Sequence, residues 1–479
     1  MVEGVSPAQQ YGYDVVNEST RRSRPKIELR NEDDIAKRRE RDILVSTTRD
    51  AKRNFAVAAW MVRKHLDYVS DFTFRIDTTN DAFDAEVTAF MKRWQRRQNC
   101  HVARRHPFRR LFRMAEYNRV VDGDTFFELM KSGSLNLIRG DRVRDRFGNR
   151  ADEWKNGLKI NRYGAILSAA VHRRGVGGGF VFDKELSARN FIHHGYFDDS
   201  EQFRGVSPLT VAVNTLKDSY ESVDFALAKL KAEMILGFAL TRKPIDGNNP
   251  FQGNKQFDGD DDDEQEANRV DEEKSGLANF GEGIWFQELE EGEDIKSIQG
   301  NSPSANAQNF LDAAIHLSLK ALDIPLSFWR EDFTNFHGAR GALQQYKASA
   351  KNKQDDNRDI LFEITQWIIT KAIIDGEIQL PRGWRLDEID FQWISRGIPW
   401  WDRSKEIIGD NRAVAGCFDN PIDICLDHGT RDPFYNIDQT KRVLEYAREH
   451  LGEFGVQPSW GTDPSLEEIK DALKEETEE

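Results

Sequence analysis

The sequence predicts an α+β protein whose long helices are separated by strand-rich segments. The apolar heptad pattern of Ser207–Leu236 indicates one long helix, and the helical periodicity of Ala342–Ile374 indicates another. Short apolar runs bounded by turn residues, which are typical of strands and hairpins, occupy the region between Thr125 and Phe182. With 479 residues, the chain is too long for one ordinary core, so we expect several modules.

The chain is acidic overall, but its charge is unevenly distributed. The net charge is −14, whereas a protein dedicated to binding duplex DNA is usually basic. Basic residues nevertheless crowd the first quarter, in Arg21–Arg24, Lys37–Arg41 and Arg93–Arg110, and acidic residues dominate Asp258–Glu273. The overall charge therefore argues against a sequence-reading DNA binder, and only local basic groups are expected to touch phosphates.

The sequence offers no segment for a membrane. No stretch reaches the ~20 apolar residues that a membrane-spanning helix needs. Residues Met1–Gln10 lack the basic and apolar regions of a signal peptide. We therefore expect no membrane partner, and a protein that is made in, and initially stays in, a cytoplasm.

Helical and strand-like patterns alternate in the first 200 residues. Apolar residues recur at helical spacing in three segments, and a β-rich run follows a turn and precedes its own hairpin partner. The expected elements are helices at Glu32–Val69, Ala82–Gln98 and Phe108–Arg119, and strands at Thr125–Met130 and Leu135–Ile138.

The glycine run Gly175–Gly179 is similar to a phosphate-binding loop only in composition. A dinucleotide fingerprint needs a helix directly after the glycines, but the strand-like Phe180-Val181-Phe182 follows here. We therefore expect a flexible hairpin at this position and no cofactor.

The segment Ser207–Leu236 has the most regular helical pattern. Ser207 suits the N-cap, and Pro208 suits the first turn. Apolar residues then alternate spacings of four and three, at Leu209, Val213, Leu216, Tyr220, Val223, Leu227, Leu230 and Met234. Such a seam fits either a core helix of one domain or a long strut against neighbouring subunits, and the period alone does not decide between them.

Residues 242–276, which follow this helix, are rich in Gly, Asn, Asp and Glu. The acidic cluster Asp258–Glu264 lacks the bidentate Glu and the two flanking amphipathic helices of a calcium-binding EF-hand. We therefore expect a solvated loop without a bound metal, and then a strand at Gly283–Gln287.

Further helices are expected in the C-terminal part of the chain. The first of them carries Leu311, Ile315 and Leu319 on one face and stops before Pro325. The expected elements are helices at Ser304–Leu322, Ala342–Ile374 and Asp438–Leu451 and from Ser465, a loop at Ser327–Gly341, and a strand at Ile389–Trp393.

Catalytic residues are not expected. His193 and His194 lie near two aspartates, but adjacent histidines on a strand point in different directions, which favours hydrogen-bonding roles. Asp122 and Asp124 flank a glycine in a turn, where backbone geometry explains them more simply than catalysis does.

The three cysteines have no metal-binding spacing. They lie at positions 100, 417 and 425, and a zinc site would need a closely spaced set. Cys417 and Cys425 could meet by chance, but because disulfides are rare in a cytoplasm, we expect buried free thiols.

Five motifs in order make the chain resemble the lambda-type portal proteins of tailed bacteriophages. Each alone is weak, but their order covers roughly residues 40–455. They are Val121–Phe127 (a "DGE-hydrophobic-F" strand), Leu186–His194 ("PA-x-x-V-I-H"), Gln202–Leu209 ("Q-x-R-G-x-S-x-L"), Phe333–Arg340 (a polar tract ending in Ala-Arg) and Trp401–Glu406 ("W-x-D-P-x-K-E", with Arg and Ser replacing Pro). The N-terminal arm and the acidic segment depart from the family pattern and inherit no role from it.

The resemblance implies a ring, usually of twelve subunits, with wing, stem, clip and crown regions. The implied regions are a flexible basic arm at 1–30, a wing at 31–205 with a return segment at 377–400, a stem helix at 206–236, a clip with the acidic loop at 237–303, a second stem helix at 304–325, a tunnel loop at 326–341, a long helix at 342–376 and a helical crown at 401–479.

The resemblance also implies roles for individual residues. The stem contacts between subunits would be made by Leu216, Tyr220, Val223, Leu227, Leu230, Leu311, Ile315 and Leu319. The DNA channel would be lined by Phe328, Trp329, Asp332, Phe333, Asn335, Phe336 and His337, unless this segment is instead a capped loop between helices that is buried against the wing. The docking surface of the clip would include Trp285, Phe286 and Glu288.

The implied function is that of a non-enzymatic channel at one capsid vertex. The implied partners are copies of the chain in a dodecamer, double-stranded DNA, the terminase large subunit, the major capsid and scaffolding proteins, and a head-tail adaptor. The protein would assemble in the host cytoplasm and reside in the virion. The basic first quarter keeps open a nucleic-acid processing enzyme or its accessory subunit as the alternative, and a generic assembly scaffold is a third option.

Overall fold

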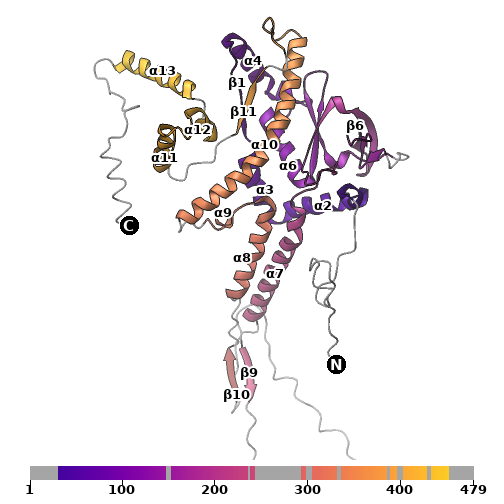
Figure 1. Cartoon of the computed structure of the whole chain (residues 1–479). Helices are drawn as coiled ribbons and strands as arrows, with labels where there is room; N and C mark the ends of the chain where they lie inside the picture. The colour runs from indigo at the N-terminus through magenta and orange to yellow at the C-terminus, as the bar shows by residue number, and fades with distance from the viewer. Residues whose placement is uncertain are drawn as a thin grey trace, which may run out of the picture. The chain divides into compact units, whose positions relative to one another are not determined.

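The computed structural model describes residues 31–146, 153–235, 238–242, 293–297, 305–331, 336–385, 389–395, 403–428 and 433–451. Contacts divide the chain into a main unit, Met1–Leu216 with Ile315–Glu479, and an insert unit, Lys217–Ala314. Helices and strands are mixed throughout, as the sequence predicts (Figure 1). Among the helices of these ranges, none has the length and apolar character needed to cross a bilayer. The expected features at 1–30, 258–273, 283–287 and beyond 465 lie outside the described residues.

The single helix expected at Glu32–Val69 is divided into three. They are α1 (Glu32–Ile35), α2 (Arg38–Asn54) and α3 (Ala56–Val69). The backbone is extended at Phe55, with φ −102° and ψ 118°, and the Phe55 side chain packs against the same core as Ala51 and Val57. The apolar periodicity therefore continues across the break, which explains why the sequence does not reveal it.

Three further helices lead to the first sheet. In α4 (Asp81–Trp94), the side chain of Asn80 accepts a hydrogen bond from the Phe83 amide at 3.2 Å. A short helix, α5 (Arg97–Cys100), follows, so the expected helix at Ala82–Gln98 ends four residues early. The next helix, α6 (Phe108–Asp122), ends at Gly123, whose φ of 96° lies in the left-handed region that glycine favours.

Two antiparallel sheets follow α6. The first has the order β3-β2-β8, with β2 (Asp124–Leu129) paired to both β3 (Leu135–Arg139) and β8 (Phe191–Gly195). The second has the order β4-β5-β6-β7, formed by Trp154–Lys155, Leu158–Ile160, Ile166–Arg174 and Phe180–Ser187. The β2–β3 hairpin and the hairpin across Gly175–Gly179 are both confirmed.

A strand from the C-terminal part of the chain returns to the N-terminal part. Strand β1 (Phe72–Ile76) pairs antiparallel with β11 (Phe391–Ser395), and Figure 1 shows the two side by side. The strand expected at Ile389–Trp393 therefore exists two residues later. The pairing joins a segment within 377–400 to the N-terminal part of the chain, and the assignment of that segment to a wing stays a prediction.

The remaining elements include the long helices. They are α7 (Thr210–Ile235), α8 (Ala305–Leu319) with a 3₁₀ turn at Lys320–Leu322, α9 (Leu326–Arg330), α10 (Phe336–Ile374), α11 (Arg403–Ala415), α12 (Pro421–Asp427) and α13 (Pro433–Leu451). In the insert unit, β9 (Phe238–Arg242) pairs antiparallel with β10 (Glu293–Ser297). Thus α10 begins six residues before the expected Ala342, and α7 begins three residues after the expected Ser207.

The long helix α10 connects two of the three apolar clusters of the main unit. Its first half contributes Tyr346 and Ala350 to the cluster that contains α3 and the start of α7. Its second half contributes Leu361, Ile364 and Ile368 to the cluster built on α4, α6 and β11. A third, smaller cluster lies around Phe126 and Leu158. Because one helix of 39 residues packs into both clusters, it fixes the position of one cluster relative to the other.

Two glycines from separate motifs lie directly against each other. The Tyr196 amide donates to the Gly123 carbonyl at 2.9 Å, and the Val206 amide donates to the Tyr196 carbonyl at 3.2 Å. A Cβ atom added to Gly205 would lie 2.1 Å from the Gly123 oxygen. Both positions therefore exclude a side chain, because backbone occupies the space.

We expect Gly205→Ala to destabilise the folded chain by about 1–3 kcal/mol, because the added methyl group must displace backbone. The matched control is Gly179→Ala, where an added Cβ has nothing within 4 Å and the effect should stay within about 0.5 kcal/mol. Urea unfolding at equal protein concentrations measures both. Equal stability of the two variants would contradict the close approach of Gly123 and Gly205.

Candidate functional site

The segment that leads into α7 is anchored by a buried ion pair. Arg204 Nε donates to Asp124 Oδ2 at 2.6 Å, and Arg204 Nη2 contacts Asp124 Oδ1 at 3.1 Å. Neither side chain is exposed to solvent. The same guanidinium donates to the carbonyl oxygens of Gly140 and Val143 at 2.7 and 2.9 Å and to that of Asn156. Arg204 therefore joins β2 to the loops before β4 and β5.

A second arginine completes this cluster. Arg41 Nη2, from α2, lies 3.0 Å from Asp124 Oδ1 and donates to the Gly205 carbonyl at 2.9 Å. Burial would raise the pKa of Asp124, but the charges of Arg204 and Arg41 hold that pKa well below its ordinary value. Burial and the neighbouring Arg204 charge lower the pKa of Arg41 to about 10. Asp124 is therefore a structural anion at the start of β2, held by ion pairs and not by the turn geometry that the sequence suggested.

A second buried cluster lies on α6. Glu116 Oε1 is 2.6 Å from His65 Nε2, and Glu116 Oε2 is 3.2 Å from His194 Nε2 and 3.4 Å from Arg119 Nη1. Arg119 also contacts Asp356 of α10 at 2.6 Å. Burial would raise the pKa of Glu116, but the Arg119 charge and the two histidine contacts keep it well below its ordinary value. This cluster links α3, α6, β8 and α10.

The two adjacent histidines of β8 belong to different clusters. His193 Nε2 lies 3.3 Å from Asp124, whereas His194 points to Glu116. Hydrogen-bonding roles, which the strand geometry predicts, are therefore confirmed. Within the described part of the chain, no group of three or more His, Cys, Asp and Glu side chains could hold a metal ion.

The cysteine prediction holds in part. All three cysteines are free, and Cys100 is buried. Burial raises the pKa of the Cys100 thiol to about 12. Cys417, however, is exposed, so the expectation of a buried thiol is wrong there. Its backbone has a φ of 59°, at the turn that follows α11.

The apolar seam of α7 changes character along its length. Leu209, Val213 and Leu216 lie in the core of the main unit, with Leu216 only 1% exposed. In the insert unit, Val223, Leu227 and Leu230 are 41%, 47% and 36% exposed. The first half of the seam therefore belongs to a core, and the second half is exposed in a single chain, where its role as a strut against neighbouring subunits stays a prediction.

The expected stem contacts need a correction at two positions. Leu216 and Leu319 are almost completely buried within the chain itself and so are removed from the set that could face a neighbouring subunit. Ile315 packs partly against the same core. Tyr220 and Leu311 are half-buried, and Phe310 of α8 is 58% exposed.

The expected tunnel loop is largely helical. Residues Leu326–Arg330 form α9, and α10 already begins at Phe336. The Trp329 ring contacts Trp60 edge-on at 5.5 Å between centroids, and the Phe328 ring lies 5.3 Å from that of Tyr346. Phe328 and Trp329 thus pack partly on the core of the chain, and their expected place in a channel stays a prediction.

Several expected site residues lie outside the described parts. Asp332, Phe333 and Asn335 fall between α9 and α10, and the clip residues Trp285, Phe286 and Glu288 fall between β9 and β10. For Phe336 and His337, the structure places the backbone in the first turn of α10.

The buried partners of the site were missed at the level of the sequence. Arg204 is visible only as part of a motif, because its partner Asp124 is 80 positions away. Glu116 and Arg119 give a clearer signal, since they occupy the same helical face as the apolar Phe112 and Ala115. A charge within an apolar face indicates a buried partner.

Replacing Asp124 with Asn should cost about 3–5 kcal/mol, because it leaves two buried arginines without their counter-charge. Asp183→Asn on exposed β7 is the control and should change stability by less than about 0.5 kcal/mol. Because the folded pKa of Asp124 is depressed, its stabilisation is complete above the unfolded pKa of about 3.9 and is lost as the pH falls through the folded value. Urea unfolding from pH 7 to pH 3 measures this; a cost below about 1 kcal/mol at pH 7 would be inconsistent with the ion pair.

Comparison with known proteins identifies one matching family and several solved structures of similar fold. No curated protein matches the chain. The neck of an empty gene transfer agent particle, computed with C6 symmetry, is 14% identical with a TM-score of 0.46, over 81% of this chain and 94% of that chain. The virion of a native gene transfer agent particle is also 14% identical with a TM-score of 0.46, over 82% and 99%. The neck of the native particle, computed with C12 symmetry, is 16% identical with a TM-score of 0.42, over 81% and 94%.

The family is shown by the sequence itself. The model of "Phage portal protein, lambda family" matches residues 19–354. The match includes both motifs that meet at the Asp124–Arg204 pair and the helices α7, α8 and α9. Because it spans more than half of the sequence, this chain belongs to the lambda family of phage portal proteins.

Proposed function

We propose that copies of this chain form a closed ring, of about twelve subunits, whose channel carries the phage genome into and out of the capsid. The observation that carries the proposal is the uncovered apolar surface of α7. Val223, Leu227 and Leu230 follow one another at spacings of four and three, so they share one face of the helix. In a single chain all three remain exposed.

One large apolar side chain also lies on the opposite side of α7, beside the polar Ser222 and Lys229. Phe225 is 74% exposed and lies roughly 160–200° around the helix from Val223 and Leu227, at about 100° per residue. Because the two sides of α7 differ but both carry exposed apolar side chains, the helix suits a head-to-tail contact, in which each subunit offers different faces to its two neighbours. Contacts of this kind generate closed rings when the rotation between neighbours closes.

The variant Val223→Glu/Leu227→Glu/Leu230→Glu should fail to form rings, because assembly would bury three unpaired charges. The control places the same three charges on exposed apolar residues of the wing, as Tyr163→Glu/Val176→Glu/Val181→Glu, and should assemble as the wild type does. Light scattering measures the mass of each assembly relative to the 55.2 kDa chain. Normal rings from the α7 variant would reject the stem contact.

We further propose that residues 332–335, between α9 and α10, contact DNA in the channel. The anchoring of Phe328 and Trp329 on the core supports this role, because it fixes the point from which the segment leaves. Asp332, Phe333 and Asn335 remain the proposed channel residues, together with Phe336 and His337 at the start of α10. Weak overall attraction suits a conduit, and the net charge of −14 fits a surface along which DNA slides.

The variant Asp332→Ala/Phe333→Ala/Asn335→Ala should leave ring assembly intact and reduce the number of DNA-filled capsids at least several-fold. Phage complementation, with encapsidated DNA quantified after nuclease treatment, measures the effect. The matched control Asp198→Ala/Phe197→Ala/Asn190→Ala removes the same three side-chain types from exposed parts of the wing and should package normally. Wild-type filling by the channel variant would show that these residues do not act on DNA.

The proposed partners follow from the same assignment. The clip at 237–303, with Trp285, Phe286 and Glu288, would dock the terminase large subunit during packaging and the head-tail adaptor afterwards. The wing would meet the major capsid and scaffolding proteins, and the ring would reside at one vertex of the virion after assembly in the host cytoplasm. The portal family is structural, and we assign no catalytic activity to this chain.

A further inference from the structure

A dense basic surface on the main unit is not used by the proposed function. Between Lys92 and Arg110 the sequence holds eight Lys and Arg residues and no Asp or Glu, in a chain whose net charge is −14. This stretch covers the end of α4, the whole of α5 and the start of α6, and we call it the basic corner. All eight cationic residues are exposed: Lys92, Arg93, Arg96, Arg97, Arg104, Arg105, Arg109 and Arg110.

The local fold concentrates these charges. The Phe108 amide donates to the Gln95 carbonyl at 3.0 Å, and the rings of Trp94 and Phe108 lie 4.9 Å apart. The Cys100 thiol is 3.6 Å from the carbonyl oxygens of both Gln95 and His106. The chain thus folds back on itself within a few residues, and the cations project from one compact corner.

Few of these charges are neutralised within the chain. Arg93 pairs with Glu377 at 2.5 Å, and Arg109 pairs with Asp71 at 2.6 Å. Across the ranges that the structure describes, the other six cations have no acidic partner within salt-bridge distance. Their mutual repulsion is unfavourable unless an external anion offsets it.

The start of α6 adds to the positive potential. No side chain caps its first turn, which contains no acidic residue and carries Arg109 and Arg110. Cations at a helix N-terminus are opposed by the helix dipole, so this arrangement also costs free energy when no anion is bound. Partial burial and the charges of His106 and Arg105 lower the pKa of His101, at the centre of the corner.

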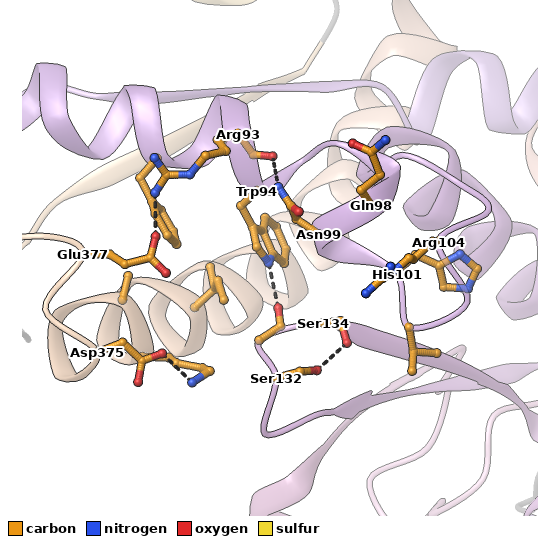
Figure 2. Close-up of a pocket in the computed structure, with 16 residues that line it drawn as sticks. Arg93, Trp94, Gln98, Asn99, His101, Arg104, Ser132, Ser134, Asp375 and Glu377 are labelled. Carbon is orange, nitrogen blue, oxygen red and sulfur yellow. Dashed lines mark hydrogen bonds and ion pairs between the residues drawn. The ribbon is translucent and has the colours of Figure 1, made fainter.

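A cleft of about 440 Å³ opens beside the basic corner (Figure 2). Figure 2 shows Gln98, His101 and Arg104 on one side of it and Asp375 and Glu377 on the other. The two carboxylates are already paired, Asp375 with Lys371 at 2.6 Å and Glu377 with Arg93. The side next to the basic corner therefore presents hydrogen-bond donors and positive charge without an unpaired carboxylate.

We propose that the basic corner binds the phosphate backbone of duplex DNA, at residues distinct from those proposed for the channel. Seven of the eight cations are arginines, whose planar guanidinium groups bind phosphate oxygens in pairs. The choice of DNA over an acidic protein rests on the proposed function, because a portal works beside a genome. The proposed binding is independent of base sequence, because contacts to phosphate groups carry no information about the sequence.

The test uses the full-length protein and covalently closed circular duplex DNA, which cannot thread an assembled ring. The variant is Arg96→Gln/Arg97→Gln/Arg105→Gln. The matched control, Arg63→Gln/Arg173→Gln/Arg189→Gln, removes three exposed arginines elsewhere on the same unit and gives the same net charge. Affinity is measured by filter binding at several NaCl concentrations, and the mass of each sample is measured in parallel.

The basic-corner variant should bind the circle at least about ten-fold more weakly than the wild type does. The slope of log K against log [NaCl] should be less steep by up to about 2.7, because three phosphate contacts are lost. The control should stay within about two-fold of the wild type. Equal losses in both variants, or a wild type that binds poly-glutamate and not the circle, would overturn the proposal. If ring assembly itself fails, the measured mass changes but binding of the circle does not, because the circle can contact the surface of a ring and of a single chain alike.

Discussion

The buried pair of Asp124 and Arg204 is the interaction on which the geometry of the main unit depends. Removing two charges from water costs several kcal/mol each, and the cost is recovered only when every polar atom finds a partner. Here Arg204 meets both carboxylate oxygens of Asp124 and three backbone carbonyls, and Arg41 supplies a second counter-charge. The contact is possible because Gly123 and Gly205 leave room for the two backbones to touch. These contacts therefore fix the position of the segment before α7 relative to strand β2.

The Glu116 cluster fixes α10 in the same way. Glu116 holds His65 and His194, and Arg119 reaches Asp356 of α10. Strand β8 joins the two clusters, because His193 faces Asp124 and His194 faces Glu116. Buried charges of this kind specify which elements meet, while the apolar clusters supply the stabilisation. In the proposed ring, this frame would serve as a rigid base for the helices that meet neighbouring subunits.

Much of the fold could be predicted from local patterns. The α7 seam, the β2–β3 hairpin and the glycine hairpin each leave a periodic or turn signal within a few residues, and the structure contains all three. The break at Phe55 left no signal, because both flanking helices pack on one core. The ends of α7 and α10 differed from expectation because capping and packing set them. Ser207, expected as the cap of α7, accepts a hydrogen bond from the Leu209 amide at 3.2 Å and also donates to the Val120 carbonyl, while the helix itself begins at Thr210.

For the candidate functional residues too, local patterns gave only part of the answer. Periodicity identified the apolar face of α7 but could not separate Leu216, which the chain itself buries, from Val223, which stays exposed. That distinction depends on where the main unit ends. The resemblance implied that Phe328 and Trp329 lie in a channel, but it did not reveal that they pack against Trp60 and Tyr346, which are distant in sequence. Contacts between residues far apart in the chain decided both cases.

The proposed ring requires that neighbouring copies cover the exposed apolar face of α7. Native mass spectrometry of the purified wild-type chain tests this requirement, because a closed ring has one fixed stoichiometry. We expect a single dominant species at an integer multiple of 55.2 kDa, near twelve, that persists on dilution. A monomer, or a ladder of species that changes with concentration, would contradict the closed ring.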